Sequence, residues 1–242
     1  MSHNLVLKEG AFVVTDAHYS SSRNEFLEFL KAIETKKLLP TQLVFLGDMF
    51  DALFGGIPHT YEKNQEAIDI INRLSKEIEI LYLEGNHDYN LKKIFPHAIV
   101  FPIFAQPVAC QYNNKKIYLS HGDFDAPFGY QIYTFLIRNP FVLFILRYID
   151  KWTNHSILKF VDRHLNKKDD CKELSWFDDL IDRRITNKYK GDWFLEGHFH
   201  QNKTIKLPHI RYINLGAFAC NQRYFIVKSL NNEELLEEKV FS

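Results

Sequence analysis

The 242-residue chain is long enough to bury one sizeable core, and its 46% apolar and 25% charged residues are typical of a globular protein. Its 30 basic residues equal its 30 acidic residues, which argues against nucleic-acid binding over the whole surface. The 21 Phe residues indicate either a large aromatic core or a surface that meets an apolar partner.

The first half of the chain alternates short apolar runs with amphipathic stretches. The apolar runs are typical of buried strands and lie at residues 11–15, 43–46 and 78–83. Between them, residues 24–37 and 64–76 carry apolar side chains at helical spacing. This alternation predicts βαβ units, in which crossover helices join parallel strands.

The second half places strand patterns around a long helical segment. Residues 108–112 and 115–119 flank Asn113-Asn114, which predicts a two-residue hairpin turn. Further strands are expected at residues 193–195, 211–215 and 224–230. We therefore expect residues 1–130 and 191–242 to form the core, and residues 131–190 to form a helical insertion that is not an independent domain.

Neither a signal peptide nor a membrane span is expected. Residues 1–10 contain no apolar h-region. The most apolar window, residues 132–149, is interrupted by Arg138-Asn139-Pro140, whereas a spanning helix needs about 20 mostly apolar residues. The cysteines are three in number, widely spaced and without a CxxC pair: Cys110, Cys171 and Cys220. They are expected to be structural thiols in a reducing, cytosolic environment.

Polar clusters follow the apolar strands. In chain order they are Asp16-Ala17-His18, Gly47-Asp48, Gly85-Asn86-His87-Asp88, His121-Gly122-Asp123 and Gly197-His198-Phe199-His200. In open α/β sheets ligands bind beyond the carboxyl ends of the strands, so these clusters are expected to converge at one edge. Mixed carboxylate, amide and imidazole groups suit Mn, Fe, Zn or a similar divalent ion better than a calcium cage.

Each cluster taken singly has an ordinary explanation. A Gly-Asp pair after a strand is most often a turn, and Asn-His-Asp in a loop can cap the next helix. His198 and His200 can equally mark an exposed strand end. Five such clusters, each at the end of an apolar run, are hard to reach by chance and together predict a metal site.

The ordered motifs D-x-H, G-D, G-N-H-D, H-G-D and G-H-x-H resemble those of the calcineurin-like metallophosphoesterases. The resemblance covers nearly the whole chain outside residues 131–190. It implies an α/β fold, a four-layer α/β/β/α sandwich, and two divalent metal ions. One metal would be held by Asp16, His18 and His200, the other by Asn86, His121 and His198, with Asp48 bridging both.

The resemblance also suggests a phosphoester hydrolase, since a pair of cations activates water and stabilises the charge that develops on phosphorus. His87 adjoins the ligand Asn86 and is not needed for the metals. We assign His87 to stabilising the phosphoryl oxygens or protonating the leaving group, with a structural role as the alternative. Asp88 is expected to orient His87 or to hold the turn.

The insertion combines apolar faces with basic residues. One face at helical spacing consists of Phe141, Phe144, Ile145, Tyr148, Ile149 and Trp152, and a second of Ile157, Phe160, Val161, His164 and Leu165. The basic residues are Arg138, Arg147, Lys151, Lys159, Arg163, Lys167 and Lys168. This pattern is compatible with binding to a membrane surface or an anionic lipid, and equally with a hairpin packed on the core with a solvated basic face.

A narrower resemblance concerns the order of features after His121-Gly122-Asp123. Tyr130, then Arg138-Asn139-Pro140 and an apolar helix, together with residues 211–218, resemble the UDP-2,3-diacylglucosamine pyrophosphatases of lipid A synthesis. That family is manganese-dependent and releases UMP and 2,3-diacylglucosamine 1-phosphate, with a helical cap over the acyl chains. Contacts with this nucleotide-linked glycolipid would come from Asp125, Tyr130, Arg138 and Asn139. The resemblance implies a cytoplasmic enzyme associated peripherally with the inner membrane.

The chain departs from that narrower family, which usually carries Arg where this chain has His87, and which has a paired Asp where this chain has Asp125 alone. His87 favours a general phosphatase, phosphodiesterase or nucleotide pyrophosphatase of the same superfamily. A membrane-associated binding module with an inactive site is the alternative of another class. A nuclease would need a basic groove, which the neutral overall charge does not suggest.

Overall fold

The structure, a computed structural model, describes residues 5–126, 128–153, 171–228 and 234–242. Two mixed sheets form its centre, with strand orders β13-β12-β1-β2-β4-β6 and β10-β11-β9-β8-β7. The first sheet contains β1 (Phe12–Val14), β2 (Leu43–Phe45), β4 (Ile80–Leu83), β6 (Ile99–Phe101), β12 (Arg223–Val227) and β13 (Leu236–Val240). The second contains β7 (Val108–Tyr112), β8 (Lys115–Ser120), β9 (Trp193–Glu196), β10 (Lys203–Leu207) and β11 (Ile210–Asn214).

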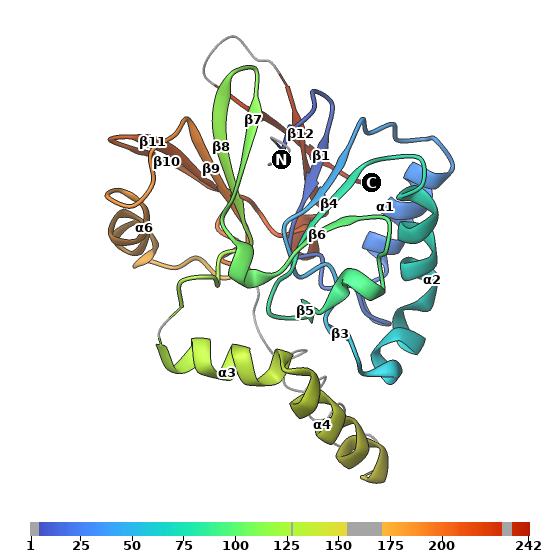
Figure 1. Ribbon diagram of the computed structural model, residues 1–242. Helices are drawn as coiled ribbons and strands as arrows, with labels where there is room; N and C mark the ends of the chain where they lie inside the picture. Colours follow the sequence, from blue (N-terminus) through green and yellow to red (C-terminus); the bar gives the residue numbers. More distant parts are fainter. Residues whose placement is uncertain (1–4, 127, 154–170, 229–233) are drawn as a thin grey trace.

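The helices cover the outer faces of the two sheets, giving four layers (Figure 1). α1 (Glu25–Glu34) and α2 (Pro58–Leu74) pack on the first sheet through an aromatic-rich core that includes Phe26, Phe29 and Phe45. α6 (Phe177–Ile185) packs on the second sheet through Phe177 and Ile181. The facing sheets bury a third apolar cluster. The α/β/β/α sandwich expected from the motifs is therefore confirmed.

Parallel pairing explains why one edge of the sandwich collects the polar clusters. β1, β2, β4 and β6 pair in parallel in the first sheet, as do β8, β9 and β11 in the second. Parallel strands present their carboxyl ends at the same edge, and buried parallel strands read as continuous apolar runs. β4, for example, is buried along its whole length, and the polar cluster of Gly85 to Asp88 begins two residues beyond it.

Several elements differ from the predicted ones. α2 begins at Pro58, six residues before the predicted start at residue 64, because proline is favoured in a first helical turn and the Thr60 hydroxyl donates to the Ile57 carbonyl. The small paired strands β3 (Leu53–Phe54) and β5 (Asp88–Tyr89), with β6, β10 and β13, were not predicted. They are too short or too exposed to show a strand pattern. Two 3-10 turns, η1 (Leu91–Lys93) and η2 (Ile103–Ala105), complete this region.

The described helices of the insertion are α3 (Phe128–Arg138), α4 (Pro140–Trp152) and α6. α3 and α4 follow β8 in the chain and lie beyond the edge near β3 and β5 (Figure 1). The second apolar face, expected at Ile157, Phe160, Val161, His164 and Leu165, lies outside the described residues. Among the described helices, none combines the length and apolar character that crossing a membrane requires.

The prediction of three free thiols is wrong for two of them. Cys171, six residues before α6, forms a disulfide with Cys220 of α7 (Phe218–Asn221), and their Cα atoms are 5.8 Å apart. The two cysteines are 49 residues apart in sequence, so their proximity depends on the fold and leaves no local spacing pattern. Cys110 on β7 is a buried free thiol.

Thiol titration checks this pairing. Unreduced native protein is expected to give no rapidly reacting thiol, because Cys110 is buried and burial raises the pKa of its thiol to about 12. Denaturation without reduction should expose Cys110 alone, and denaturation after reduction should expose all three cysteines. Three reactive thiols in the denatured, unreduced protein would contradict the disulfide.

Candidate metal centre

Five loops from both sheets meet at the carboxyl edge and bring the predicted ligands together. Within the described residues, three groups of side chains have potential ligand atoms within 4.8 Å of one another: Asp16 with His18 and His200, Asp48 with His121 and His198, and His18 with Asp51 and His87. The first two groups coincide with the two ligand sets expected from the sequence, apart from the amide of Asn86, which is described below. The structure thus gathers residues that are up to 184 positions apart, from Asp16 to His200.

The backbone at these positions is held in an unusual conformation. The five residues Asp16, His18, Asp48, His198 and His200 all have positive φ, between 45° and 64°. Non-glycine residues adopt this left-handed region infrequently, and such residues gather at functional sites. Gly85 serves a related purpose, since a Cβ atom there would collide with the Asp48 carboxylate. The loops therefore hold strained backbone conformations at the positions that direct these side chains toward one another.

The first group surrounds the carboxylate of Asp16. Its Oδ2 accepts hydrogen bonds from the Thr15 hydroxyl (2.5 Å) and the His198 backbone N–H (2.9 Å). Its Oδ1 is buried, lacks hydrogen-bond geometry to any described group, and lies 3.1 Å from Nε2 of His200. The rings of His18 and His200 have centroids 5.6 Å apart. One carboxylate oxygen is thus fixed by the protein while the other faces the imidazoles.

The second group is built around His121. Its Nδ1 lies 2.8 Å from the Leu46 carbonyl, which can only accept, so Nδ1 carries the proton. In the neutral ring Nε2 holds the lone pair, and it lies 3.3 Å from both Asp48 Oδ2 and Asn86 Oδ1. The ring centroid of His198 is 5.0 Å from that of His121. A histidine whose second nitrogen is fixed by a carbonyl is the usual arrangement for a metal ligand.

Asp48 connects the loops. Its Oδ1 accepts the backbone N–H of His87 at 2.8 Å, and its Oδ2 lies 3.3 Å from Nε2 of His121 and 4.0 Å from Nε2 of His87. The side chain is 3% exposed. Burial alone would raise the pKa of Asp48, but the adjacent His121 and His87 lower it well below its usual value. Asp48 is therefore a buried carboxylate that stays charged.

The electrostatics of the cluster fit positive ions. Burial opposes ionisation of Asp16, yet His200 and His121 lower the pKa of this carboxyl below its ordinary value. Burial lowers the pKa of His198 to about 3, with His121 contributing, so this imidazole is neutral and able to ligate. Burial also opposes protonation of His121, but Asp48 raises its pKa well above normal. The buried carboxylates thus attract positive charge to the space that divalent cations would fill.

His87 and Asp88 have different surroundings. Nδ1 of His87 donates to the Asp51 carbonyl at 3.0 Å, which leaves Nε2 facing Asp48, and its ring lies 4.8 Å from that of His18. Asp88 is fully buried and accepts hydrogen bonds from the backbone N–H groups of Asp48, Met49 and Gly85 and from the Tyr82 hydroxyl. Of the two roles considered for Asp88, these contacts support holding the turn.

Two side chains at the site escaped prediction. Oδ1 of Asp51 lies 3.3 Å from Nδ1 of His18, on the loop that follows Asp48. A carboxylate in this position orients a ligating histidine and raises its basicity. The Thr15 hydroxyl donates to Oδ2 of Asp16 and holds that carboxylate in place. The run Gly-Asp-Met-Phe-Asp offered a signal for Asp51, a second acid three residues after the first, but no ligand pattern.

The residues expected to contact substrate are distributed around the same edge. Arg138 is buried, donates from Nη2 to the Gly85 carbonyl at 2.6 Å, and keeps Nε and Nη1 without hydrogen-bond partners in the described part of the chain. Asn139 caps α4 by accepting from the backbone N–H groups of Phe141 and Val142. Asp125 pairs with Arg184 at 2.6 Å. Tyr130 lies in the first turns of α3.

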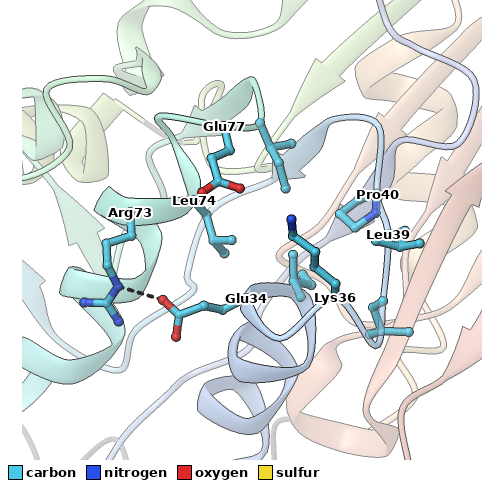
Figure 2. A pocket seen from close by; sticks show the side chains of 10 residues that line it. Glu34, Lys36, Leu39, Pro40, Arg73, Leu74 and Glu77 are labelled. Atoms are coloured by element: carbon cyan, nitrogen blue, oxygen red, sulfur yellow. Dashed lines mark hydrogen bonds and ion pairs between the residues drawn. The ribbon is translucent and has the colours of Figure 1, made fainter.

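A hollow of about 270 Å³ lies elsewhere, between the C-terminal ends of α1 and α2. Figure 2 shows Glu34 and Arg73 bridged by an ion pair on one side and Leu39 with Pro40 on the other. The hollow contains none of the ligand candidates. We assign it no part in the chemistry.

The match to a family profile agrees with this geometry. A profile described as calcineurin-like phosphoesterase matches residues 11–202. A protein named UDP-2,3-diacylglucosamine hydrolase from Pseudomonas fluorescens (strain SBW25) is 24% identical over 219 residues, covering 87% of this chain and 84% of that protein. A protein of the same name from Pseudomonas syringae pv. tomato is 26% identical over 206 residues, covering 81% of each. The solved structure of Yfce, a phosphoesterase from E. coli, covers 96% of this chain and 99% of its own, with a TM-score of 0.46 and 14% identity.

Proposed function

Because the chain belongs to the calcineurin-like phosphoesterase family, we propose that it cleaves the pyrophosphate bond of UDP-2,3-diacylglucosamine, giving UMP and 2,3-diacylglucosamine 1-phosphate. The chain is a metal-dependent phosphoester hydrolase, and its relatives named UDP-2,3-diacylglucosamine hydrolase cover most of its length. The proposal concerns the substrate, the identity of the metals and the residues that act.

The observation that carries the proposal is an apolar surface joined directly to the loop of Asn86 and His87. α3 and α4 expose large apolar side chains, among them Phe128, Phe135, Phe141, Phe144, Tyr148 and Trp152. Soluble proteins rarely leave contiguous apolar patches of this kind without a partner. Arg138, at the end of α3, binds the Gly85 carbonyl, and Leu143 of α4 packs on Tyr89. A substrate with a charged diphosphate and two acyl chains matches a charged site beside an apolar one.

The ligand assignment follows from the two groups of side chains. We propose that Asp16, His18 and His200 hold one cation, that Asn86, His121 and His198 hold the other, and that Asp48 bridges them. Mixed oxygen and imidazole donors suit Mn²⁺, our proposed metal. When bound, such a pair supplies Lewis-acid stabilisation of the phosphoryl group and an activated water. His87 directs Nε2 toward the same space, where, once the ring is protonated to the imidazolium, it can donate a proton to a phosphoryl or leaving-group oxygen.

The insertion, residues 131–190, serves in this proposal as a cap that shelters the acyl chains, and the remainder of the chain forms the catalytic core. Nε and Nη1 of Arg138 are buried and lack hydrogen bonds in the described part of the chain, although Nη1 lies 4.0 Å from Glu84, and these donors suit a phosphate oxygen. Asp125, Tyr130 and Asn139 remain predicted contacts. The apolar cap would also rest on the inner-membrane surface, placing the enzyme at its cytoplasmic side. The disulfide between Cys171 and Cys220 is unusual for a cytoplasmic protein, because cytosolic thiols are kept reduced.

The direct test is an assay of UMP release. Purified protein with Mn²⁺ is expected to release UMP from UDP-2,3-diacylglucosamine with a kcat/KM far above that for UDP-glucose or a nitrophenyl phosphodiester. Equal or greater activity on the soluble substrates would instead support a general phosphoesterase, which His87 favours, since the narrower family usually carries Arg there. Absence of any hydrolysis by protein that holds two Mn²⁺ ions would reject both functions.

The apolar surface of the cap makes a second prediction. The double change Phe141→Ser and Phe144→Ser is expected to raise the KM for UDP-2,3-diacylglucosamine by about tenfold or more, because full burial of each side chain by acyl chains is worth about 1.5–3 kcal/mol. Activity on a soluble phosphodiester should stay unchanged. Leu39→Ser is the matched control, since Leu39 is 72% exposed but lines the hollow of Figure 2. An unchanged KM for the acylated substrate would show that these cap side chains do not bind the substrate.

A further inference from the structure

Arg184 is a buried cation on α6, outside the candidate ligand set. It is 8% exposed although it belongs to a residue type that is almost never fully buried unless paired. The guanidinium lies 5.4 Å from the ring centre of Phe124 and 5.1 Å from that of Phe199. Those two aromatic residues follow the His121-Gly122-Asp123 and Gly197-His198 clusters, so Arg184 reaches the loops that carry the second ligand group.

The guanidinium satisfies its donors on three separate acceptors. Nε and Nη2 bind the Asp125 carboxylate at 2.6–3.1 Å. Nη1 and Nη2 bind the two oxygens of Glu196, each at 3.1 Å, in a bidentate pair. Nη2 also donates to the Gly122 carbonyl at 3.0 Å. Only the planar fork of arginine can make this set of contacts, because lysine offers a single point charge.

These acceptors adjoin His121 and His198. Gly122 directly follows His121, and Glu196 lies two residues before His198 at the end of β9. Glu196 is fully buried and also accepts from the Tyr212 hydroxyl at 2.5 Å, so it cannot move to accommodate a change. The loops already interlock, since a Cβ atom at Gly122 would lie 2.7 Å from the Cβ of His198. A bond from one side chain to both loops therefore sets their separation.

We propose that Arg184 is a positioning residue that clamps the His121 loop to the His198 loop and so preforms the second cation site. The inference rests on the ligand assignment of the proposed function and adds a residue of α6 that binds no metal itself. Positioning contacts of this kind typically change metal affinity by about 10–100-fold. Arg184 makes no hydrogen bond to Asp16 or His18 in the described part of the chain, but His200 lies on the His198 loop, whose backbone N–H at His198 donates to Asp16. The first cation site should therefore weaken less than the second.

The test measures Mn²⁺ binding by isothermal titration calorimetry on metal-stripped protein. Wild-type protein is expected to bind two ions. Arg184→Lys retains a positive charge beside Glu196, which limits the folding cost, but lacks the fork. We expect it to weaken one site by about tenfold or more and to change the affinity of the other site much less. Excess Mn²⁺ should restore part of the lost hydrolysis. Arg183→Lys is the matched control, because Arg183 is exposed on the same helix.

The outcomes separate the inference from the function on which it rests. Two wild-type affinities in Arg184→Lys, whatever its melting temperature, would overturn the clamp while leaving the function intact. Weakening of both sites equally would assign Arg184 to general stability and also overturn it. If Arg184→Lys does not fold, the double variant Arg184→Met with Glu196→Gln removes both buried charges and carries the same expectation. A wild-type protein that binds no metal pair would instead reject the proposed function.

Discussion

Replacing Asp48 by Asn is expected to lower kcat by about 10³-fold or more, because the charge stabilisation supplied by bound cations is worth several kcal/mol. Asp48 belongs to the second ligand group, with Oδ2 3.3 Å from Nε2 of His121, and its charge also acts on Asp16 and His18 of the first group. Asn preserves the size of the side chain and the acceptor for the His87 backbone N–H. The loss would therefore reflect charge and ligation, not collapse of the loop.

Metal content distinguishes the role of Asp48 from a role in folding. Calorimetry of Asp48→Asn with Mn²⁺ should show at least one of the two ions bound more weakly, with a melting temperature for the metal-free form close to that of the wild type. Asp69→Asn is the control, since Asp69 lies exposed on α2 and its contact is a surface bond with Gln65. Full hydrolysis by Asp48→Asn, with two ions held normally, would overturn the bridging assignment.

The sequence was sufficient to predict the part of the site that sits at strand ends. β1, β2 and β4 are buried along their whole length, and β8 and β9 are buried toward their carboxyl ends, so all five contain apolar runs against which the polar residues that follow stand out. Parallel pairing then brings those ends to one edge without further information. For this reason the sequence alone predicts that Asp16, Asp48 and His121 lie close together.

Contacts that depend on packing between distant layers could not be predicted in this way. Arg184 lies on an amphipathic helix whose other basic residue, Arg183, is exposed, and spacing alone does not reveal which of the two is buried. Cys171 and Cys220 meet only because the fold brings the segment before α6 beside α7. The edge strands β10 and β13 carry mostly exposed or half-exposed side chains, so their alternation is too weak for a strand prediction.

Replacing His87 by Gln is expected to lower kcat by about 10²–10³-fold while leaving two Mn²⁺ ions bound, since general acid–base groups typically contribute 10²–10⁴-fold. The main-chain bond from residue 87 to Asp48 survives the change. His59→Gln is the matched control, because His59 lies on α2 beside Glu62. His87 also belongs to a potential ligand group with His18 and Asp51. If His87→Gln loses one bound ion, His87 is a metal ligand and not an acid–base group.

His87→Arg separates the two chemical roles considered for this side chain. Arginine offers donors to a phosphoryl oxygen but does not release its proton near neutral pH, because its pKa lies above about 12. If His87 acts by stabilising charge, His87→Arg should hydrolyse substrate faster than His87→Gln. If it protonates the leaving group, the two variants should be equally slow. Because Nδ1 of His87 is committed to the Asp51 carbonyl, only Nε2 is available for either role, and the comparison isolates that one nitrogen.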